Sequence, residues 1–121
     1  MRILFFCHRF NSLSQRLYCE LSERGHEVSV ELDVHPDLMA EAAMLYKPDF
    51  ILAPFLKRKI PREIWESFLT LVVHPGPPGD RGPSAIDWAL LRGEKSWGVS
   101  LIEANEEYDA GDILAYRTFP I

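Results

Sequence analysis

A histidine that follows an apolar run is the first candidate for chemistry in this sequence. His74 stands in LVVHPGPPGDRGPS, residues 71–84, which hold four of the nine prolines and three of the seven glycines. Asp109 stands in EYDAGDIL, where Ala110 and Gly111 predict a turn. A carboxylate on one ring nitrogen fixes the tautomer of a neutral histidine and raises its basicity. His74 and Asp109 are therefore predicted to be a general base and its partner, although a histidine at a strand end is also commonly structural.

Two other segments have residues that could bind a ligand. CHRFNSLSQR, residues 7–16, lacks the GxGxxG and GxxxxGK(S/T) patterns of dinucleotide and nucleoside triphosphate sites. Ser12 and the free amides at a helix start can still hold an anion, with charge from Arg9 and Arg16. Plain helix capping with solvated arginines explains the same residues equally well. On composition alone, the segment APFLKRKIP, residues 53–61, would place Phe55 in the core and the basic run after it, Lys57, Arg58 and Lys59, in solvent.

The elements that position these segments alternate between strands and helices. Apolar or alternating runs predict strands at residues 2–7, 28–32, 50–53, 69–73, 97–103 and 112–119. Helices are predicted from Ser12, with Gln15 completing a capping box, to a C-cap at Gly25, and at residues 37–46, 61–68 and 84–91. This order predicts an α/β, Rossmann-like, doubly wound and mostly parallel sheet. Ligands of such sheets bind at the carboxyl ends of the strands, where His74 lies.

Composition limits the class of protein. A chain of 121 residues with 47% hydrophobic residues can form one domain with a core. The net charge of -5 argues against a nucleic-acid partner. Two cysteines, Cys7 and Cys19, indicate buried thiols in a reducing compartment and not a disulfide framework. Neither a membrane-spanning run nor a signal peptide is present, so a cytoplasmic location is expected.

The run HPGPPGDRGPSAIDWALLRGEKSWGVSLIEANEEYDAGDIL resembles the signature region of the formyltransferases that use N10-formyltetrahydrofolate, such as glycinamide ribonucleotide and methionyl-tRNA formyltransferases. That family carries an Asn-x-His-Pro strand end, an Arg-Gly loop, a Gly-Val-(Thr/Ser) strand and an Asp-x-Gly turn. The order is matched by His74, Arg81, Gly82, Gly93, Gly98, Val99, Ser100, Asp109 and Gly111. The resemblance covers nearly the whole chain and implies the formyltransferase fold.

FNSLSQRL, GHEVSVEL, APFLKRKIP, VVHPG, GDRGPSAIDWA and EANEEYDAGDI more closely resemble the N-terminal domain of the HypX (HoxX) hydrogenase-maturation proteins. This resemblance implies formyl transfer from N10-formyltetrahydrofolate to coenzyme A, the first step of carbon monoxide ligand synthesis for nickel–iron hydrogenase. In that family a crotonase-like domain then releases carbon monoxide from formyl-CoA. Residues 1–121 are therefore expected to be the formyltransferase-like domain of a longer chain. The implied partners are the crotonase-like domain and other hydrogenase-maturation proteins.

The resemblance also implies roles for individual residues. His74 would be the base and Asp109 the group that orients it. The expected folate contacts are Phe55, Leu56, Lys57, Asn105 and Tyr108, and the expected acceptor contacts are Arg9, Asn11, Ser12, Gln15 and Arg81. Arg81 has a second interpretation, in which it holds its own loop through carbonyl groups. No metal site is expected, because the spacing of histidine, cysteine and acidic residues does not fit a ligand set.

Position 72 departs from the family pattern. Side chains two apart on a strand share a face, so Val72 stands beside His74 where the family has a catalytic asparagine. Loss of one such oxyanion donor typically costs about 10²–10³ in rate. A thiol acceptor offers a partial explanation, since a thiolate is a strong nucleophile with an ordinary pKa of about 8.5.

The loop after His74 departs from the pattern as well. It is one residue shorter than in the amine-acceptor enzymes and carries Gly76 and Gly79, which indicates a changed acceptor cleft. Two alternatives to coenzyme A stay open. The acceptor could be an amine on a sugar nucleotide or an aminoacyl-tRNA, or the chain could be a folate-binding module without chemistry of its own.

Overall fold

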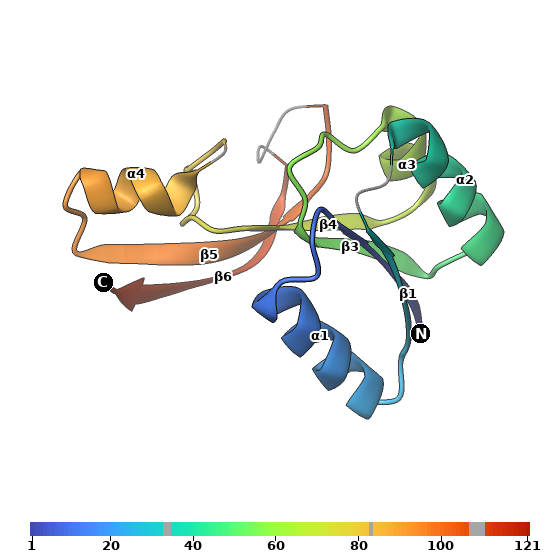
Figure 1. The fold of residues 1–121 in the computed structure, drawn as a ribbon. Coiled ribbons are helices and arrows are strands. Elements are labelled where there is room, and N and C mark those ends of the chain that lie inside the picture. The colour runs from blue at the N-terminus through green and yellow to red at the C-terminus, as the bar shows by residue number, and fades with distance from the viewer. Residues whose placement is uncertain (33–34, 83, 107–110) are drawn as a thin grey trace.

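A computed structural model describes residues 1–32, 35–82, 84–106 and 111–121. The described helices and strands follow one another as predicted (Figure 1). They are β1 (Arg2–Cys7), α1 (Ser12–Glu23), β2 (Glu27–Leu32), α2 (Pro36–Tyr46), β3 (Phe50–Phe55), α3 (Arg62–Ser67), β4 (Thr70–His74), α4 (Ala85–Leu91), β5 (Ser96–Glu103) and β6 (Ile113–Pro120). Within these ranges, every helix is too short or too polar to cross a membrane.

The strands form one sheet in the order β2, β1, β3, β4, β5, β6. β2, β1, β3 and β4 are parallel, which confirms the predicted α/β fold and mostly parallel sheet. β5 and β6 run antiparallel to their neighbours, so the sheet is mixed. The sequence pattern did not reveal this reversal, because a helix between two strands does not by itself fix the direction in which the chain returns.

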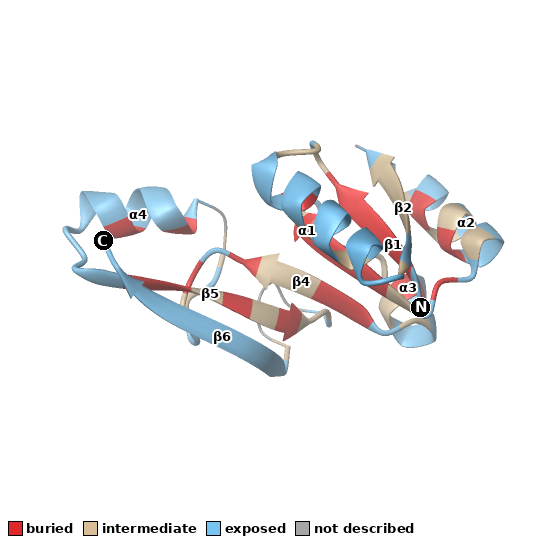
Figure 2. Ribbon diagram, turned by 90° about the horizontal axis from the view of Figure 1, so that it is seen from below, coloured by how far each residue is buried: buried red, intermediate tan, exposed pale blue. Residues whose placement is uncertain are grey.

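Helices cover both faces of the parallel strands (Figure 1). In β1, Leu4 and Phe6 pack on the side of α2 and α3, whereas Ile3 and Phe5 pack on the side of α1. This alternation explains why β1 is a continuous apolar run, since a strand buried on both faces has no polar side. Figure 2 shows the buried core concentrated in these strands.

The end of the sheet that holds β6 is much more exposed. α4 buries only Ala85 and Ala89 against Trp97 of β5. All eight residues of β6 are exposed (Figure 2), among them the apolar side chains of Ile113 and Leu114. The compact part of the molecule is therefore the parallel half, and it supports the end of β4 where His74 lies.

The two cysteines have opposite surroundings. Cys7, the last residue of β1, is 1% exposed, and burial raises the pKa of its thiol while a hydrogen bond with Ser14 acts in the opposite direction. Cys19 is exposed on α1, so the prediction of a buried thiol is wrong for this residue. The thiolate is the reactive form of cysteine, so both burial and protonation protect Cys7.

We expect iodoacetamide at pH 8 to alkylate Cys19 at least about tenfold faster than Cys7. Peptide mapping by mass spectrometry checks this, with denatured protein as the control in which both thiols react alike. Equal rates in the native protein would contradict the burial of the end of β1.

Candidate active site

The loops after β1 and β3 meet at the carboxyl edge of the sheet. The backbone N–H of His8 donates to the carbonyl oxygen of Phe55 at 2.6 Å. The two rings stand edge to face with centroids 6.3 Å apart. The predicted acceptor loop and the predicted folate loop are therefore in contact, as expected for parallel strands that end at one rim.

His74 ends β4 and is almost completely buried, with 3% of its side chain exposed. Its Nε2 lies 2.7 Å from Oδ2 of Asp80, whose side chain is 18% exposed. A carboxylate this close to a buried imidazole is a charge-assisted hydrogen bond. Asp109, the predicted partner of His74, lies outside the described residues, whereas Asp80 was not predicted as a partner.

The loop that follows His74 is held against β5. Trp97 Nε1 donates to the carbonyl oxygen of Pro75 at 2.8 Å, and Ser100 Oγ donates to that of Gly76 at 2.7 Å. Ser100 is 1% exposed and pairs with His74 in the β4–β5 register. Ser100 was singled out by the family pattern, but the anchoring role of Trp97 was missed, because indole partners are not visible in a sequence.

Val72 lies two residues before His74 on β4, and its side chain packs partly against the core beside α2 and α3. It pairs with Ala53 on β3 and Ile102 on β5. An apolar residue thus occupies the strand position where the family has asparagine. An oxyanion donor at this site must come from another group.

The start of α1 differs from the prediction. Asn11, not Ser12, is the N-cap, since its Oδ1 accepts from the backbone N–H of Ser14 at 3.0 Å and from Ser14 Oγ at 2.7 Å. Gln15 Nε2 reaches back to the carbonyl oxygen of Phe10 at 2.9 Å. Asparagine is among the preferred N-cap residues, and the N-cap therefore lies one residue earlier than predicted. Arg9 is exposed beside this turn.

The remaining predicted acceptor contacts stay exposed. Ser12 and Gln15 are exposed on the first turn of α1, and Arg81 is exposed directly after Asp80. The structure thus gives Asn11 and Gln15 a structural role in the loop.

Of the predicted folate contacts, Phe55 at the end of β3 and Leu56 after it are half-buried, whereas Lys57 is exposed. The Lys57 ammonium lies 5.9 Å from the centroid of the Phe55 ring. The loop therefore presents an aromatic face beside a positive charge. That combination suits an aromatic ligand with a negative charge.

Asn105 and Glu106 follow β5 and are exposed. Glu106 Oε1 pairs with Arg62 Nη2 of α3 at 2.9 Å, which links this segment to the helix that follows the folate loop. A hydrogen bond to Glu66, with the charges of Glu66 and Glu106, raises the pKa of Arg62. Tyr108 lies outside the described residues.

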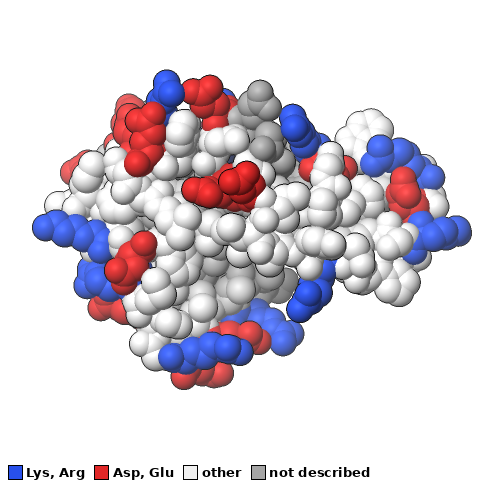
Figure 3. Space-filling model, turned by 180° about the vertical axis from the view of Figure 1, so that it is seen from behind, with Lys and Arg blue, Asp and Glu red and all other residues white. Residues whose placement is uncertain are grey.

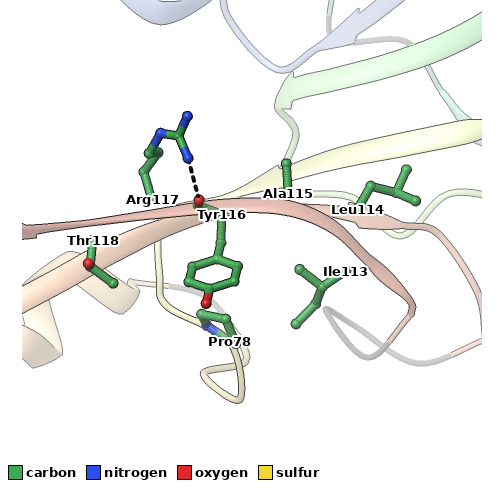
Figure 4. Close-up of a pocket in the computed structure, with 7 residues that line it drawn as sticks. All are labelled: Pro78, Ile113, Leu114, Ala115, Tyr116, Arg117 and Thr118. Atoms are coloured by element: carbon green, nitrogen blue, oxygen red, sulfur yellow. Dashed lines mark hydrogen bonds between the residues drawn. The ribbon is translucent and has the colours of Figure 1, made fainter.

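A groove of about 730 Å³ lies along β6, and Figure 4 shows the side chains that line it: Pro78, Ile113, Leu114, Ala115, Tyr116, Arg117 and Thr118. Only Pro78 belongs to the loop after His74. The groove is open along the exposed strand, whereas the candidate base His74 and the predicted folate contact Phe55 lie at the rim. We place the candidate site at the rim, because a reaction needs the base within hydrogen-bond reach.

Charged side chains are interspersed on the face drawn in Figure 3, with acidic and basic groups side by side. Basic side chains on this face are thus separated by acidic ones, unlike the continuous basic surface that binds a nucleic-acid backbone. Among the described residues, no three histidine, cysteine or acidic side chains are placed to hold a metal ion.

The sequence profile of the family described as Formyl transferase matches residues 33–121. Hydrogenase maturation factor HoxX of Bradyrhizobium diazoefficiens is 60% identical over all of this chain and 21% of the relative. The crystal structure of HypX from Aquifex aeolicus in complex with tetrahydrofolic acid is 74% identical with a TM-score of 0.99, over 100% of this chain and 22% of that one. A variant of that HypX carrying R9A and Q15A, among other substitutions, has a TM-score of 0.98 at 73% identity, over the same shares of the two chains.

Methionyl-tRNA formyltransferase from Clostridium thermocellum is more distant, at 25% identity and a TM-score of 0.83 over 99% of this chain and 53% of that one. The predicted resemblance to HypX and HoxX is therefore confirmed, and the chain spans about a fifth of the length of those relatives. With the fold, the rim histidine and the profile match in agreement, the chain belongs to the formyl transferase family.

Proposed function

We propose that this chain transfers a formyl group from N10-formyltetrahydrofolate to coenzyme A, as the first step of carbon monoxide ligand synthesis for nickel–iron hydrogenase. The observation that carries the proposal is a buried histidine bonded to a carboxylate at the sheet rim, beside the two ligand loops. Likeness along the full chain to a HypX crystallised with tetrahydrofolic acid supports the donor.

The folate loop fits the donor. Phe55 and Leu56 would contact the pterin, and Lys57 would meet a carboxylate of the folate tail, with Asn105 and Tyr108 at the pterin edge. When bound, N10-formyltetrahydrofolate would supply the formyl carbon. The aromatic face and the ammonium group of this loop already lie next to each other, so binding would require little rearrangement.

His74 would remove the proton of the acceptor thiol. The resulting imidazolium then lies next to the developing negative charge on the formyl oxygen and stabilises it. Burial excludes water from His74, which strengthens this interaction. Asp109 is proposed to balance the charge and to relay a proton to N10 of the leaving folate.

The rim loop after β1 would hold part of coenzyme A through Arg9, Asn11, Ser12 and Gln15, and Arg81 is proposed as a further contact to an acceptor phosphate. Arg9 and Gln15 match in type and number two of the positions substituted in the solved HypX variant. A thiol acceptor also suits Val72, since a thiolate attacks well without the missing asparagine donor.

The acceptor is tested by single-turnover reaction of the full chain with N10-formyltetrahydrofolate, offered coenzyme A or glycinamide ribonucleotide. We expect formyl-CoA and no formylated amine, with products separated by liquid chromatography and identified by mass spectrometry. Formylation of the amine alone would overturn the choice of acceptor. Folate binding with transfer to neither acceptor would favour a non-catalytic binding module.

Replacing Arg9 by alanine is expected to raise the KM for coenzyme A about tenfold, because one charge-assisted contact to phosphate is lost. kcat should change little, since Arg9 lies away from His74 in this proposal. Arg24→Ala removes another exposed arginine, at the far end of α1, and serves as the matched control. Equal KM values for both variants would remove Arg9 from the acceptor site.

The chain is further proposed to be the formyltransferase-like domain of a longer cytoplasmic maturation protein. Its span of about a fifth of HoxX and HypX supports this. A crotonase-like domain would then receive formyl-CoA and release carbon monoxide.

A further inference from the structure

We propose that Trp97 is a positioning residue that fixes the loop between His74 and Asp80 and thereby holds the proposed base in place. The inference rests on the proposed function for the identity of the reaction, but the contacts of Trp97 do not depend on it. Trp97 Nε1 donates to the carbonyl oxygen of Pro75 at 2.8 Å. Pro75 directly follows His74, so a side chain of β5 holds the first carbonyl group of the loop.

The backbone directly after His74 has little freedom left. The pyrrolidine ring of Pro75 limits its φ, and the bond to Trp97 sets the direction of its carbonyl group, which depends on ψ. A residue before a proline is itself restricted to extended conformations, and His74 is the last residue of β4. Loss of the indole bond would therefore release ψ of Pro75, the first rotation that turns the loop relative to His74.

The indole that holds this carbonyl group is itself fixed. Trp97 is 7% exposed and forms a small buried cluster with Ala85 and Ala89 of α4. The two alanines are four residues apart and share one face of the helix, and the other residues of α4 are exposed. Their short side chains let the helix pack closely on the ring. α4 therefore supports Trp97, and Trp97 supports the loop.

The rest of the loop carries this constraint to Asp80. Ser100 Oγ donates to the carbonyl oxygen of Gly76 at 2.7 Å, next to the carbonyl group that the indole holds. The backbone N–H of Asp80 donates to the carbonyl oxygen of Pro77 at 3.1 Å, which closes a turn. Oδ2 of Asp80 then lies 2.7 Å from His74 Nε2. The contact between carboxylate and imidazole therefore depends on the course of the whole loop.

Two glycines show how closely the loop is packed. A Cβ at position 76 would lie 2.5 Å from Asp80 Oδ2 and 2.6 Å from His74 Nε2, and a Cβ at position 98 would lie 3.1 Å from Cα of Pro77. The loop thus approaches both His74 and β5 more closely than side chains other than glycine would allow. Because a displacement of about 1 Å can cost about 10²-fold in rate, a loosened loop should lower kcat.

The test compares the full chain with Trp97→Phe, which keeps a buried aromatic ring but removes the N–H donor. Trp88→Phe changes an exposed tryptophan of α4 and is the matched control. The ring signals of His74 are recorded by ¹⁵N NMR of histidine-labelled protein without substrates and are assigned with His74→Gln. We expect these signals to shift in Trp97→Phe and to keep their wild-type positions in Trp88→Phe. The isostere 3-benzothienylalanine at position 97, with sulfur in place of N–H, should cause a similar shift and separates the lost donor from the smaller ring.

Kinetics provide the second readout. In Trp97→Phe, kcat for formyl transfer should fall about tenfold while the KM values for N10-formyltetrahydrofolate and coenzyme A stay within twofold. Trp88→Phe should keep kcat within twofold of the wild type. A raised KM at unchanged kcat, or His74 signals that keep their wild-type positions in both variants of Trp97, would overturn the proposal. Because the NMR measurement needs no acceptor, it decides the role of Trp97 even if the chain transfers formyl to another group or to none.

Discussion

Replacing His74 by alanine is expected to lower kcat for formyl transfer by about 10²–10⁴-fold, the usual contribution of a general base. The substitution removes the group proposed to take the thiol proton and leaves Asp80 without its imidazole. The affinity for tetrahydrofolate should change less than threefold, since the predicted folate contacts lie at the end of β3 and in the loop after it, and not on β4. Steady-state assays at saturating substrate give kcat, and tryptophan fluorescence gives folate affinity.

The control for this prediction is His26→Ala. His26 lies at the surface, where a ring nitrogen is 3.1 Å from the amino terminus, and it is far from β4 in the fold. Its loss should leave kcat within twofold of the wild type. A His74→Ala variant that is folded, binds folate and retains full kcat would show that His74 is not the base of the reaction. The residues that bind the folate would then have to account for the rate without it.

Much of the fold could be predicted because burial on both faces leaves a clear signal. The run at residues 2–7 was predicted as a strand and is β1 with the same bounds, and its side chains enter the two cores in alternation. The direction of β5 and β6 could not be predicted. Direction depends on which strand edge the returning chain meets, and no local pattern in residues 96–120 records that edge.

The site was predicted at the level of elements and only in part at the level of atoms. His74 could be placed at the rim because parallel strands end together there. Val72 could be placed on its face because the side-chain period of a strand is two. The contact of Asp80 with His74 depends instead on how a loop of proline and glycine closes, which involves anchors from Trp97 and Ser100 on another strand.

The start of α1 shows the same limit on a smaller scale. Asn11 and Ser12 are both good N-cap residues, and the sequence offered a capping box for the second. The structure uses Asn11, because its carboxamide can accept from both the amide and the hydroxyl group of the buried Ser14. The two candidates are separated here by the burial of Ser14, a tertiary feature that the local sequence does not record.

Gly111→Ala is expected to destabilise the fold by about 2–3 kcal/mol, because a methyl group there would overlap the carbonyl oxygen of Glu103. The backbone N–H of Glu103 donates to the carbonyl oxygen of Asp112 at 2.9 Å, next to the start of β6. Relief of the overlap requires Glu103 and Asp112 to separate, which weakens this bond and the adjacent pair of Ile102 with Ile113. Urea denaturation followed by circular dichroism measures the change in the free energy of unfolding.

Gly25→Ala separates this overlap from the general cost of losing a glycine. A methyl group on Gly25, which follows α1, would meet no described atom within 4 Å, but the φ of +91° gives alanine a strain of about 1–2 kcal/mol. Only Gly111→Ala should also reduce formyl transfer per folded molecule, since residue 111 ends the segment that contains Asp109. If both variants lose the same free energy of unfolding and keep full activity, the close approach of Gly111 to Glu103 adds nothing to the cost of the substitution. The segment before β6 then does not support the site.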